Sequence, residues 1–527
     1  MNLNRKLWWA QHKSNVYKYG TILSLILIVT ISIIYFTYSK FSSRNEATAY
    51  ETTVEPFIKN DYFIASYING EWSDSIPGKD DGYEVDKVVC DNGATGTWDN
   101  EEWGINIRNA TQKTKCSVYF ETKKYTDNVI AKAPKLAQGM IPVKFDASGN
   151  VVVADTSSKW YDYEAHEWAN AVLVNCAESA IKSKYFDSNN KVLSSAVGKT
   201  ISMDEILQMY VYIPRYKYQL FNAEDGTSVE QAINITFESK TTAKSTGTKN
   251  GEWLTHPAFT FGDNELAGIW VGKFETSSTS KLPKIVPNVS PLTYMNVNVL
   301  FNKSRLMTTT LASTYGTSTN DDSHMMKNME WGAVAYLSSS IYGRYTNAST
   351  CIESGCEVWI NNNSSYTTGC AGSSVSAYSD STCNAWNTAT GVNASTTGNI
   401  YGIYDMSGGT WEYVMGNYND QISYAGFSSM PEAKYYDKYT GTDSNSDFTK
   451  YHLGDATKET LKTKSMGRNA WYGDTSKSVK SSGPWVRRGG YSGDGGLVGD
   501  HAGVFTFDYI NGVENNLTSF RVVFSAL

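Results

Sequence analysis

Seven cysteines are the residues of this 527-residue chain whose chemistry depends most on spacing. They lie at positions 90, 116, 176, 351, 356, 370 and 383. The last four follow the pattern C-x4-C-x13-C-x12-C, which matches no zinc ribbon or finger, and the sequence between them is rich in Ser, Asn and Gly. We therefore expect disulfides rather than a metal centre, because thiols outside the cytoplasm tend to pair.

Sequence position limits how these cysteines can pair. Cys90 and Cys116 each end or begin a strand-like run in one small region, so they are the natural local pair. The four later cysteines allow three connectivities. The most local of these joins Cys351 to Cys356 and Cys370 to Cys383. Cys176, which follows an apolar run, would remain as a buried free thiol.

A second group with possible chemistry is Asp494, Asp500 and His501, which lie close together in sequence. If a loop gathered them, they could bind a cation or act as acid and base groups. We expect solvated loop residues, because such short polar runs form turns readily, and a cation site is the alternative. The sequence contains no G-x-S-x-G elbow, H-E-x-x-H motif or phosphate-binding glycine loop.

An uncharged segment near the N-terminus predicts the cellular location. Residues 20–39 contain no charge, and a helix of that length, at about 1.5 Å per residue, matches a bilayer core of roughly 30 Å. Four basic residues precede the segment and two follow it closely, which favours a cytoplasmic N-terminus. We expect a cytoplasmic tail at 1–19, a single uncleaved transmembrane helix at 20–39 and an extracellular remainder. A cleaved signal peptide is the competing interpretation.

Composition narrows the range of partners. The net charge is −7 and only 19% of residues are charged, so nucleic acid is not an expected partner. Apolar residues make up 41% of the chain, which is ample for a large core. The 36 Tyr and 15 Trp residues have flat apolar faces with hydrogen-bonding tips, which suit sugar rings and protein contacts.

The extracellular part divides into two expected folded regions. Residues 56–122 alternate apolar and polar side chains, which predicts a small all-β module cross-linked by its two cysteines. The polar stretch 123–138 is expected to be a linker. Residues 139–527 are expected to form one large domain.

Local patterns within the large domain predict two helices and three loops. Residues 202–205 form a capping-box pattern that predicts a short helix over the following five residues, and apolar spacing predicts a second helix near 326–341. Three polar insertions, near 222–250, 277–322 and 343–397, are expected to be surface loops.

Three blocks in the last third of the chain carry a resemblance. They are GNIYGIYDMSGGTWEYV at 398–414, WVRRGGYSGDGG at 485–496 and NNLTSFRVVFS at 515–525. In this order they resemble the formylglycine-generating enzyme and sulfatase-modifying-factor family, whose domain is a variant of the C-type lectin fold. The resemblance implies an α+β, C-type lectin-like domain with little regular secondary structure.

The residues of these blocks are expected to build the fold. Tyr404, Trp411 and Phe520 are large anchors for a domain with few regular elements. Glu412 and Arg521 are candidates for a buried ion pair. The full set expected to be structural is Tyr404, Asp405, Trp411, Glu412, Arg488, Gly489, Gly490, Phe520 and Arg521.

The chain departs from the family where catalysis would occur. The resemblance implies a copper-binding cysteine pair just after the Arg-Gly-Gly block, but Asp494 and Gly499 stand at those positions and no cysteine follows Cys383. Since Cu(I) prefers thiolate ligands, neither copper nor formylglycine generation is expected. Gly409 replaces an Asn of the family pattern, which weakens an inherited calcium site, although calcium stays the candidate cofactor.

The resemblance and the missing cysteines together suggest a protein with a catalytically degenerate domain of this family. We expect it to bind an extracellular glycan or protein and to act in adhesion at a bacterial cell surface. The candidate ligand-binding residues are Trp471, Tyr472, Trp485, Tyr491, Asp494, Asp500, His501 and Tyr509. Burial of Trp471, Trp485 and Tyr491 together would contradict this choice. The alternatives are a metal-dependent enzyme of altered chemistry and a structural subunit of a surface assembly.

Overall fold

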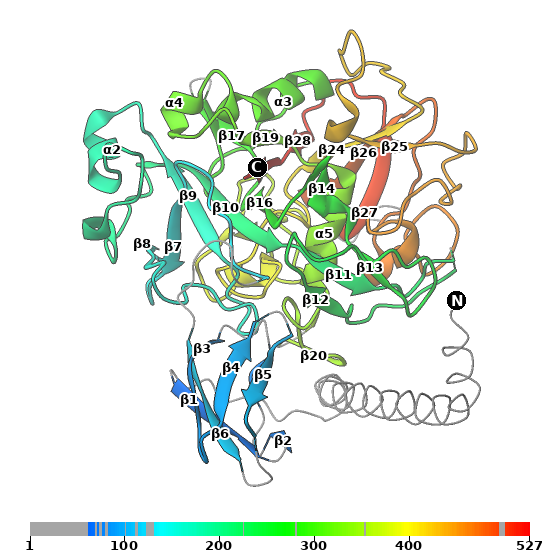
Figure 1. Cartoon of the computed structure of the whole chain (residues 1–527). Helices are drawn as coiled ribbons and strands as arrows, with labels where there is room; N and C mark the ends of the chain where they lie inside the picture. Colours follow the sequence, from blue (N-terminus) through cyan, green and yellow to red (C-terminus); the bar gives the residue numbers. More distant parts are fainter. Residues whose placement is uncertain are drawn as a thin grey trace, which may run out of the picture. The chain divides into compact units, whose positions relative to one another are not determined.

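The computed structural model describes residues 62–68, 71–72, 76–78, 83–100, 102–110, 114–122, 131–224, 226–279, 282–352, 355–494 and 501–526. The chain divides into two compact units, Met1–Lys123 and Lys124–Leu527 (Figure 1). The predicted tail at 1–19, the predicted transmembrane segment at 20–39 and the first half of the predicted linker lie outside the described residues. Within the described ranges, no helix has the length and apolar character needed to cross a membrane.

The first unit contains two antiparallel sheets. A four-stranded sheet has the order β2-β1-β6-β3 and a two-stranded sheet pairs β4 with β5. The strands are β1 (Tyr62–Ile68), β2 (Glu71–Trp72), β3 (Tyr83–Cys90), β4 (Thr95–Asp99), β5 (Gly104–Arg108) and β6 (Lys115–Thr122). Asn92 and Gly93 adopt φ of 53° and 75°, which permits the tight turn between β3 and β4.

Strand β6 supplies the core of this unit. Cys116, Val118 and Phe120 alternate along the strand and are fully buried. Cys116 lies opposite Cys90 on β3, and the two form a disulfide. Trp98 packs edge-on against Phe120 with ring centroids 5.3 Å apart. The period-two pattern seen in the sequence therefore corresponds to one buried sheet face.

The larger unit is organised around a seven-stranded sheet with the order β19-β29-β16-β10-β9-β7-β8. Its strands are β7 (Ile141–Phe145), β8 (Val151–Val153), β9 (Asn170–Val174), β10 (Ile206–Pro214), β16 (Gly268–Gly272), β19 (Asp322–Met325) and β29 (Val522–Ser525). All residues of β9, β10 and β16 are buried, so the centre of the sheet is covered on both faces. The C-terminal strand β29 lies between β16 and β19 and completes the sheet.

A second sheet brings the three resembling blocks together. Its path is β25-β24-β26-β27, and β28 pairs in parallel with β24. The strands are β24 (Trp411–Tyr418), β25 (Asp437–Tyr439), β26 (Trp485–Gly489), β27 (Gly503–Ile510) and β28 (Thr518–Phe520). Figure 1 shows β24, β26 and β27 side by side. Segments that are far apart in sequence thus share one buried sheet.

Smaller elements surround these sheets. The minor strands are β11 (Tyr216–Gln219), β12 (Ile235–Phe237), β13 (Trp253–Thr255), β14 (Thr260–Phe261), β15 (Asn264–Glu265), β17 (Ser277–Thr279), β18 (Leu282–Lys284), β20 (Tyr345–Asn347), β21 (Thr350–Cys351), β22 (Cys370–Ala371) and β23 (Asn384–Ala385). The α-helices are α2 (Ser179–Tyr185), α3 (Val297–Ser304), α4 (Ala312–Tyr315) and α5 (Asn328–Ser338).

One of the two predicted helices is present. Helix α5 is confirmed within 326–341, and all 11 of its residues are buried. The helix expected after residues 202–205 is wrong, because Ile206–Pro214 form strand β10 instead. This run contains β-branched and aromatic side chains and is buried throughout between β9 and β16. Such an environment favours a strand covered on both faces over a helix with one apolar stripe.

The α+β class expected from the resemblance is wrong for this chain. Strands far outnumber helices in the described residues, and the longest of those helices has 11 residues. The fold is β-rich. The physical reason lies in composition, since aromatic and β-branched residues favour strands while frequent Gly, Asn and Ser interrupt helices.

The third predicted surface loop, at 343–397, is exposed in part and internal in part, with buried stretches at 360–363, 368–372 and 394–397. Ile360, Thr368, Ala371 and Thr396 are fully buried. Disulfides Cys351–Cys356 and Cys370–Cys383 lie within this segment, so the connectivity is the most local of the three that the sequence left open. Buried polar residues here find partners in backbone groups, which sequence polarity alone does not reveal.

Candidate functional site

A buried ion pair lies where the two large sheets meet. Arg521, between β28 and β29, donates from Nε to Glu412 Oε2 on β24 at 3.0 Å. Its other nitrogens donate to the carbonyl oxygens of Gly272, at 2.7 Å, and Tyr404, at 3.0 Å. Arg521 and Glu412 are both fully buried. The structure therefore contains the ion pair that the sequence suggested, and its bonds join the C-terminus to both sheets.

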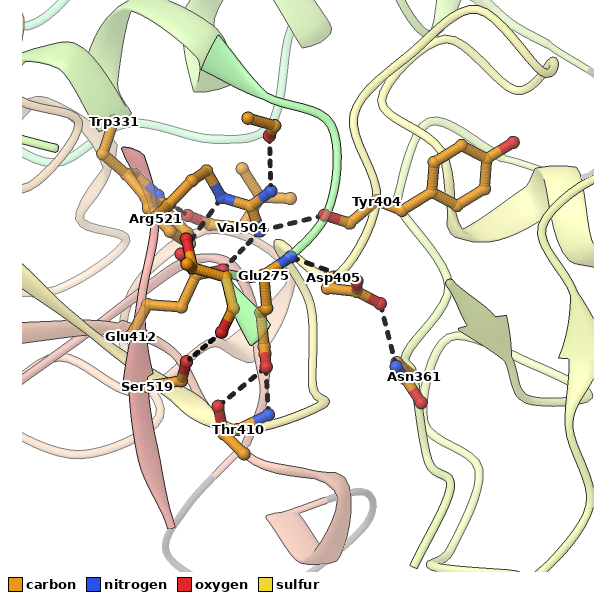
Figure 2. Close-up of polar contacts among 12 residues, drawn as sticks. Glu275, Trp331, Asn361, Tyr404, Asp405, Thr410, Glu412, Val504, Ser519 and Arg521 are labelled. Carbon is orange, nitrogen blue, oxygen red and sulfur yellow. Dashed lines mark hydrogen bonds and ion pairs between the residues drawn. The ribbon is translucent and has the colours of Figure 1, made fainter. Parts of the chain in front are cut away.

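Two further carboxylates surround this pair (Figure 2). Glu275 accepts hydrogen bonds from the Thr410 backbone nitrogen and hydroxyl, each at 2.8 Å. Asp405 accepts from Asn361 Nδ2 at 2.8 Å and from the backbone nitrogen of Gly369 at 2.9 Å. Figure 2 shows Asp405 turned toward Asn361, away from Glu412. Each of these carboxylates thus has hydrogen-bond donors of its own.

Burial dominates the acidity of this group. It raises the pKa of Glu412 to about 7, against the opposing effect of Arg521. Burial, with the nearby charges of Glu412 and Asp405, raises the pKa of Glu275 well above its ordinary value. Gly409 packs so closely that a Cβ atom there would lie 2.6 Å from Glu275 Oε1. Gly409 also has a φ of 70°, a left-handed conformation that favours glycine, so a substitution there would be strained.

Arg488, Gly489 and Gly490 lie at the end of strand β26 and hold it against neighbouring backbone. Arg488 is fully buried and donates to the carbonyl oxygens of Ala456, at 3.1 Å, and Val504, at 3.3 Å. Gly489 and Gly490 have φ of 83° and 75°, and a Cβ atom on Gly490 would lie 2.6 Å from Ala502. The two glycines thus allow a close approach of backbone that other residues would prevent.

The remaining residues expected to be structural are also internal. Tyr404 and Phe520 are fully buried, and Trp411 is 3% exposed. Tyr404 donates its hydroxyl to the carbonyl of Trp386 at 2.8 Å. These contacts are those of core residues, and none of these side chains reaches a surface where a ligand could bind.

Two of the predicted ligand-binding aromatics are also core residues. Trp471 and Trp485 are fully buried, and their indole nitrogens donate at 3.0 Å to Ser228 Oγ and to the carbonyl of Ile422. A ligand cannot contact either ring. Tyr472, Tyr491 and Tyr509 are half-buried and keep part of their surface in solvent. The condition that all three of Trp471, Trp485 and Tyr491 be buried is met for the tryptophans alone.

The two members of the predicted polar group that the structure describes, Asp494 and His501, are buried. Asp494 is buried, and its Oδ2 accepts from the Tyr491 backbone nitrogen at 3.1 Å, which closes the turn of η8 (Ser492–Asp494). Asp500 lies outside the described residues. His501 is 4% exposed and faces Asp474, with Nδ1 and Oδ1 3.4 Å apart. The expectation of solvated loop residues is therefore wrong for Asp494 and His501, because both side chains are buried against protein partners.

Glu357 completes a cluster with Asp474 and His501. One ligand atom from each of the three lies within 4.8 Å of the other two. Asp474 is 1% exposed, while Glu357 is half-buried. Burial, reinforced by the charge of Asp474, raises the pKa of Glu357 to about 9. Sequence reasoning named His501 but missed Glu357 and Asp474, because these two fall in no motif and lie far from each other along the chain.

A third buried polar group contains a histidine between two acids. His324 Nδ1 and Nε2 lie 2.8 and 2.9 Å from carboxylate oxygens of Asp322 and Glu330. Burial opposes its charge, but Glu330 and Asp322 together raise the pKa of His324 to about 9. The ring stacks on Phe261 at 4.8 Å. Arg305 also pairs with Asp322 at 2.6 Å, so two cations face the two acids.

Exposed tyrosines are the unusual feature of the surface. Tyr294, Tyr378 and Tyr424 are 68%, 69% and 68% exposed. Sequence reasoning missed all three, because they lie in polar loops without regular spacing.

Cys176 is the free cysteine of the chain and is buried, which raises the pKa of its thiol. It therefore offers no reactive thiolate.

Comparison with known proteins adds little to this geometry. No family model and no curated protein matches the chain. Among solved structures, the chain is similar to Treponema denticola variable protein 1, with 12% identity over 62% of this chain and 98% of that chain, and a TM-score of 0.23. A likeness at that TM-score supports no conclusion about fold or function. Function is therefore inferred from the side chains of this protein.

Proposed function

We propose that the large unit is a non-catalytic ligand-binding module of an extracellular adhesion protein. The observation that supports this most directly is the exposure of three tyrosine rings, each more than two thirds exposed, in a protein that buries most of its other large aromatics. Single exposed apolar side chains are ordinary, but tyrosines of this exposure supply large contact areas at low entropic cost.

Two of these tyrosines are fixed to one segment of backbone. The backbone nitrogen of Tyr294 donates to the carbonyl of Asn515 at 2.9 Å, and that of Tyr424 donates to the carbonyl of Asn511 at 3.0 Å. Both rings therefore extend from loops tethered to residues 511–515. Loops held in this way lose little freedom when a ligand binds, which favours affinity.

Tyr378 extends from the disulfide-linked loop 370–383. Its carbonyl accepts a hydrogen bond from Asn362 Nδ2. The sequence around it is dominated by Ser, Thr and Asn, whose hydroxyl and amide groups can bind the polar groups of a ligand. Tyrosine among small polar residues is the composition that antibody loops use for recognition.

The other expectations are compatible with this proposal. We infer that the resemblance to the sulfatase-modifying-factor family reflects a scaffold without its catalysis, since the chain has no cysteine after Cys383. We further propose that residues 20–39 anchor the protein in a bacterial membrane, with the large unit outside. An extracellular glycan and an extracellular protein are both suitable ligands for tyrosine-rich loops.

The test is binding of the purified full-length chain, with its disulfides intact, to a glycan array and to whole bacterial cells. The triple variant Tyr294→Ala, Tyr378→Ala and Tyr424→Ala should lose at least about tenfold in affinity, equivalent to 1.4 kcal/mol. The matched control replaces three other exposed apolar residues, Val197, Met203 and Met466, with Ala and should bind normally.

Each outcome has a distinct meaning. Saturable binding competed by a soluble sugar identifies a lectin-type adhesin, and binding to cells without glycan binding identifies a protein ligand. Unchanged binding of the tyrosine variant would refute the proposed surface. No binding to either target, with self-association in sedimentation, would favour a structural subunit.

A further inference from the structure

Glu357, Asp474 and His501 bring two carboxylates and an imidazole to one place in the large unit. They come from the 355–360 segment, from the residue after η7 (Trp471–Gly473), and from the segment before β27. Imidazole nitrogen and carboxylate oxygen are ligands of zinc and related divalent ions. The chemistry of the three side chains is thus that of a transition-metal site with one nitrogen and two oxygen donors.

The separation between two of these atoms is long for a hydrogen bond and also suits two ligands of one ion. His501 Nδ1 and Asp474 Oδ1 are 3.4 Å apart, whereas such bonds are commonest near 2.9 Å. Two ligands bound tetrahedrally to zinc with bonds of roughly 2.1 Å lie about 3.4 Å from each other. The pair of His501 and Asp474 is therefore spaced as two zinc ligands are, and the whole cluster, whose ligand atoms lie within 4.8 Å of one another, would close further around an ion.

Glu357 supplies an acceptor atom with no protein partner. Its Oε1 is inaccessible to solvent and receives no hydrogen bond in the described residues. A buried carboxylate oxygen without a donor is costly, and a cation held beside it would remove that cost. This atom is a second observation, independent of the spacing, and it is available to a cation even though Arg344 and Lys462 lie near Glu357.

The two buried ligands are held by their own backbone contacts. Asp474 Oδ2 accepts from the Phe505 backbone nitrogen at 2.9 Å, which leaves Oδ1 directed to His501. The His501 backbone nitrogen donates to Thr475 Oγ1 at 2.8 Å. Glu357 directly follows Cys356, which is tied to Cys351 by a disulfide. Such outer contacts orient metal ligands before the ion binds.

We propose that Glu357, Asp474 and His501 bind one divalent transition-metal ion of the zinc type. Three protein ligands leave a coordination position open, and the partial exposure of Glu357 gives solvent or a ligand group access to it. Calcium and magnesium fit less well, because they prefer oxygen ligands alone. This site does not depend on the tyrosine surface, so each proposal can fail without the other.

The test measures metal binding by the full-length chain. After treatment with a chelator, the protein is titrated with Zn²⁺ against a competing fluorescent chelator, and with Co²⁺ while its visible absorption is recorded. We expect one ion per chain, a cobalt spectrum typical of nitrogen and oxygen ligands, and a higher melting temperature with Zn²⁺.

Variants assign the ion to these residues. Glu357→Gln and His501→Gln should each weaken Zn²⁺ binding by at least about tenfold. Glu230→Gln is the matched control, because Glu230 lies near Glu357 but is paired with Lys462 and with the backbone nitrogen of Tyr472. Equal binding by wild type and both ligand variants, or no uptake by wild type, would overturn the site. Melting curves of the apo proteins show whether a variant is folded.

Discussion

Two groups of carboxylates in the large unit differ in how many of their oxygens receive hydrogen bonds from the protein. Glu275, Asp405 and Glu412 lie around Arg521, and each carboxylate accepts at least one hydrogen bond from a protein donor. In the cluster of Glu357, Asp474 and His501, one carboxylate oxygen has no donor. The first group is complete without a ligand, whereas the second is completed by one.

This difference separates residues that build the fold from residues available for function. The complete group contains Glu412 and Arg521, which belong to the blocks of the family resemblance. The incomplete cluster contains Glu357 and Asp474, which belong to none of them. The candidate site therefore lies outside the three resembling blocks and is inferred from the chemistry of its own side chains.

The largest expected effect is on the complete group. Arg521→Ala removes the cation from three buried carboxylates and should lower the free energy of unfolding by about 3–5 kcal/mol, measured by urea denaturation. The double variant Arg521→Met with Glu412→Leu removes both charges and should lose less than the single variant. A loss below about 1 kcal/mol for Arg521→Ala would show that the pair does not hold the two sheets together.

The buried group of His324, Asp322 and Glu330 offers a second test of paired charges in the core. The folded-state pKa of His324, about 9, is above its ordinary value of 6.5. Its stabilising contribution should be complete below about pH 6.5 and disappear as the pH rises through about 9. We expect a decrease of roughly 1–3 kcal/mol over this window in urea titrations. His324→Gln should remove that part of the pH dependence, and an unchanged slope would contradict the assignment.

A matched pair of substitutions compares the two carboxylate groups directly. Without metal, Glu412→Gln should cost about 2 kcal/mol or more, because it leaves Arg521 without its partner. Glu357→Gln should change the free energy of unfolding by less than about 1 kcal/mol, because it removes one of two facing acids. Similar losses from both substitutions, measured by thermal unfolding in chelator, would mean that Glu357 is a structural residue.

The smallest effect on stability is expected at the surface. Tyr294→Ala and Tyr424→Ala should each change the free energy of unfolding by less than about 0.5 kcal/mol, since their rings are mostly in solvent. Circular dichroism melting curves measure this directly. A much larger loss at either position would show that the ring packs against the protein and is not free for a ligand.

Part of the fold could be predicted from local sequence signals. The spacing of Met329, Ala333 and Leu337 predicted helix α5, and the alternation around Cys116 predicted the β module, because both patterns depend on residues close in sequence. The run Ile206–Pro214 was misjudged, because its strand conformation depends on neighbours β9 and β16 that are distant in sequence.

The candidate site could likewise be predicted only in part from the sequence. His501 was recognised as a possible ligand from its residue type, but its partners Asp474 and Glu357 were not. The aromatic content indicated a recognition surface, yet Trp471 and Trp485 are core residues and Tyr294, Tyr378 and Tyr424 are the exposed ones. Residue type indicates which chemistry is available, and burial decides which side chains can use it.

The sequence by itself determined the pairing partner of Cys90, the core helix α5, the anchors Tyr404 and Phe520 and the ion pair of Glu412 with Arg521. The first two follow from local spacing, whereas the anchors and the ion pair were expected from residue volume and charge within the three resembling blocks. Only the tertiary structure decided that the chain is β-rich, that polar residues near 360–371 are internal, and that Glu357, Asp474 and His501 meet. Each of these depends on contacts between segments far apart in sequence, which no local pattern encodes.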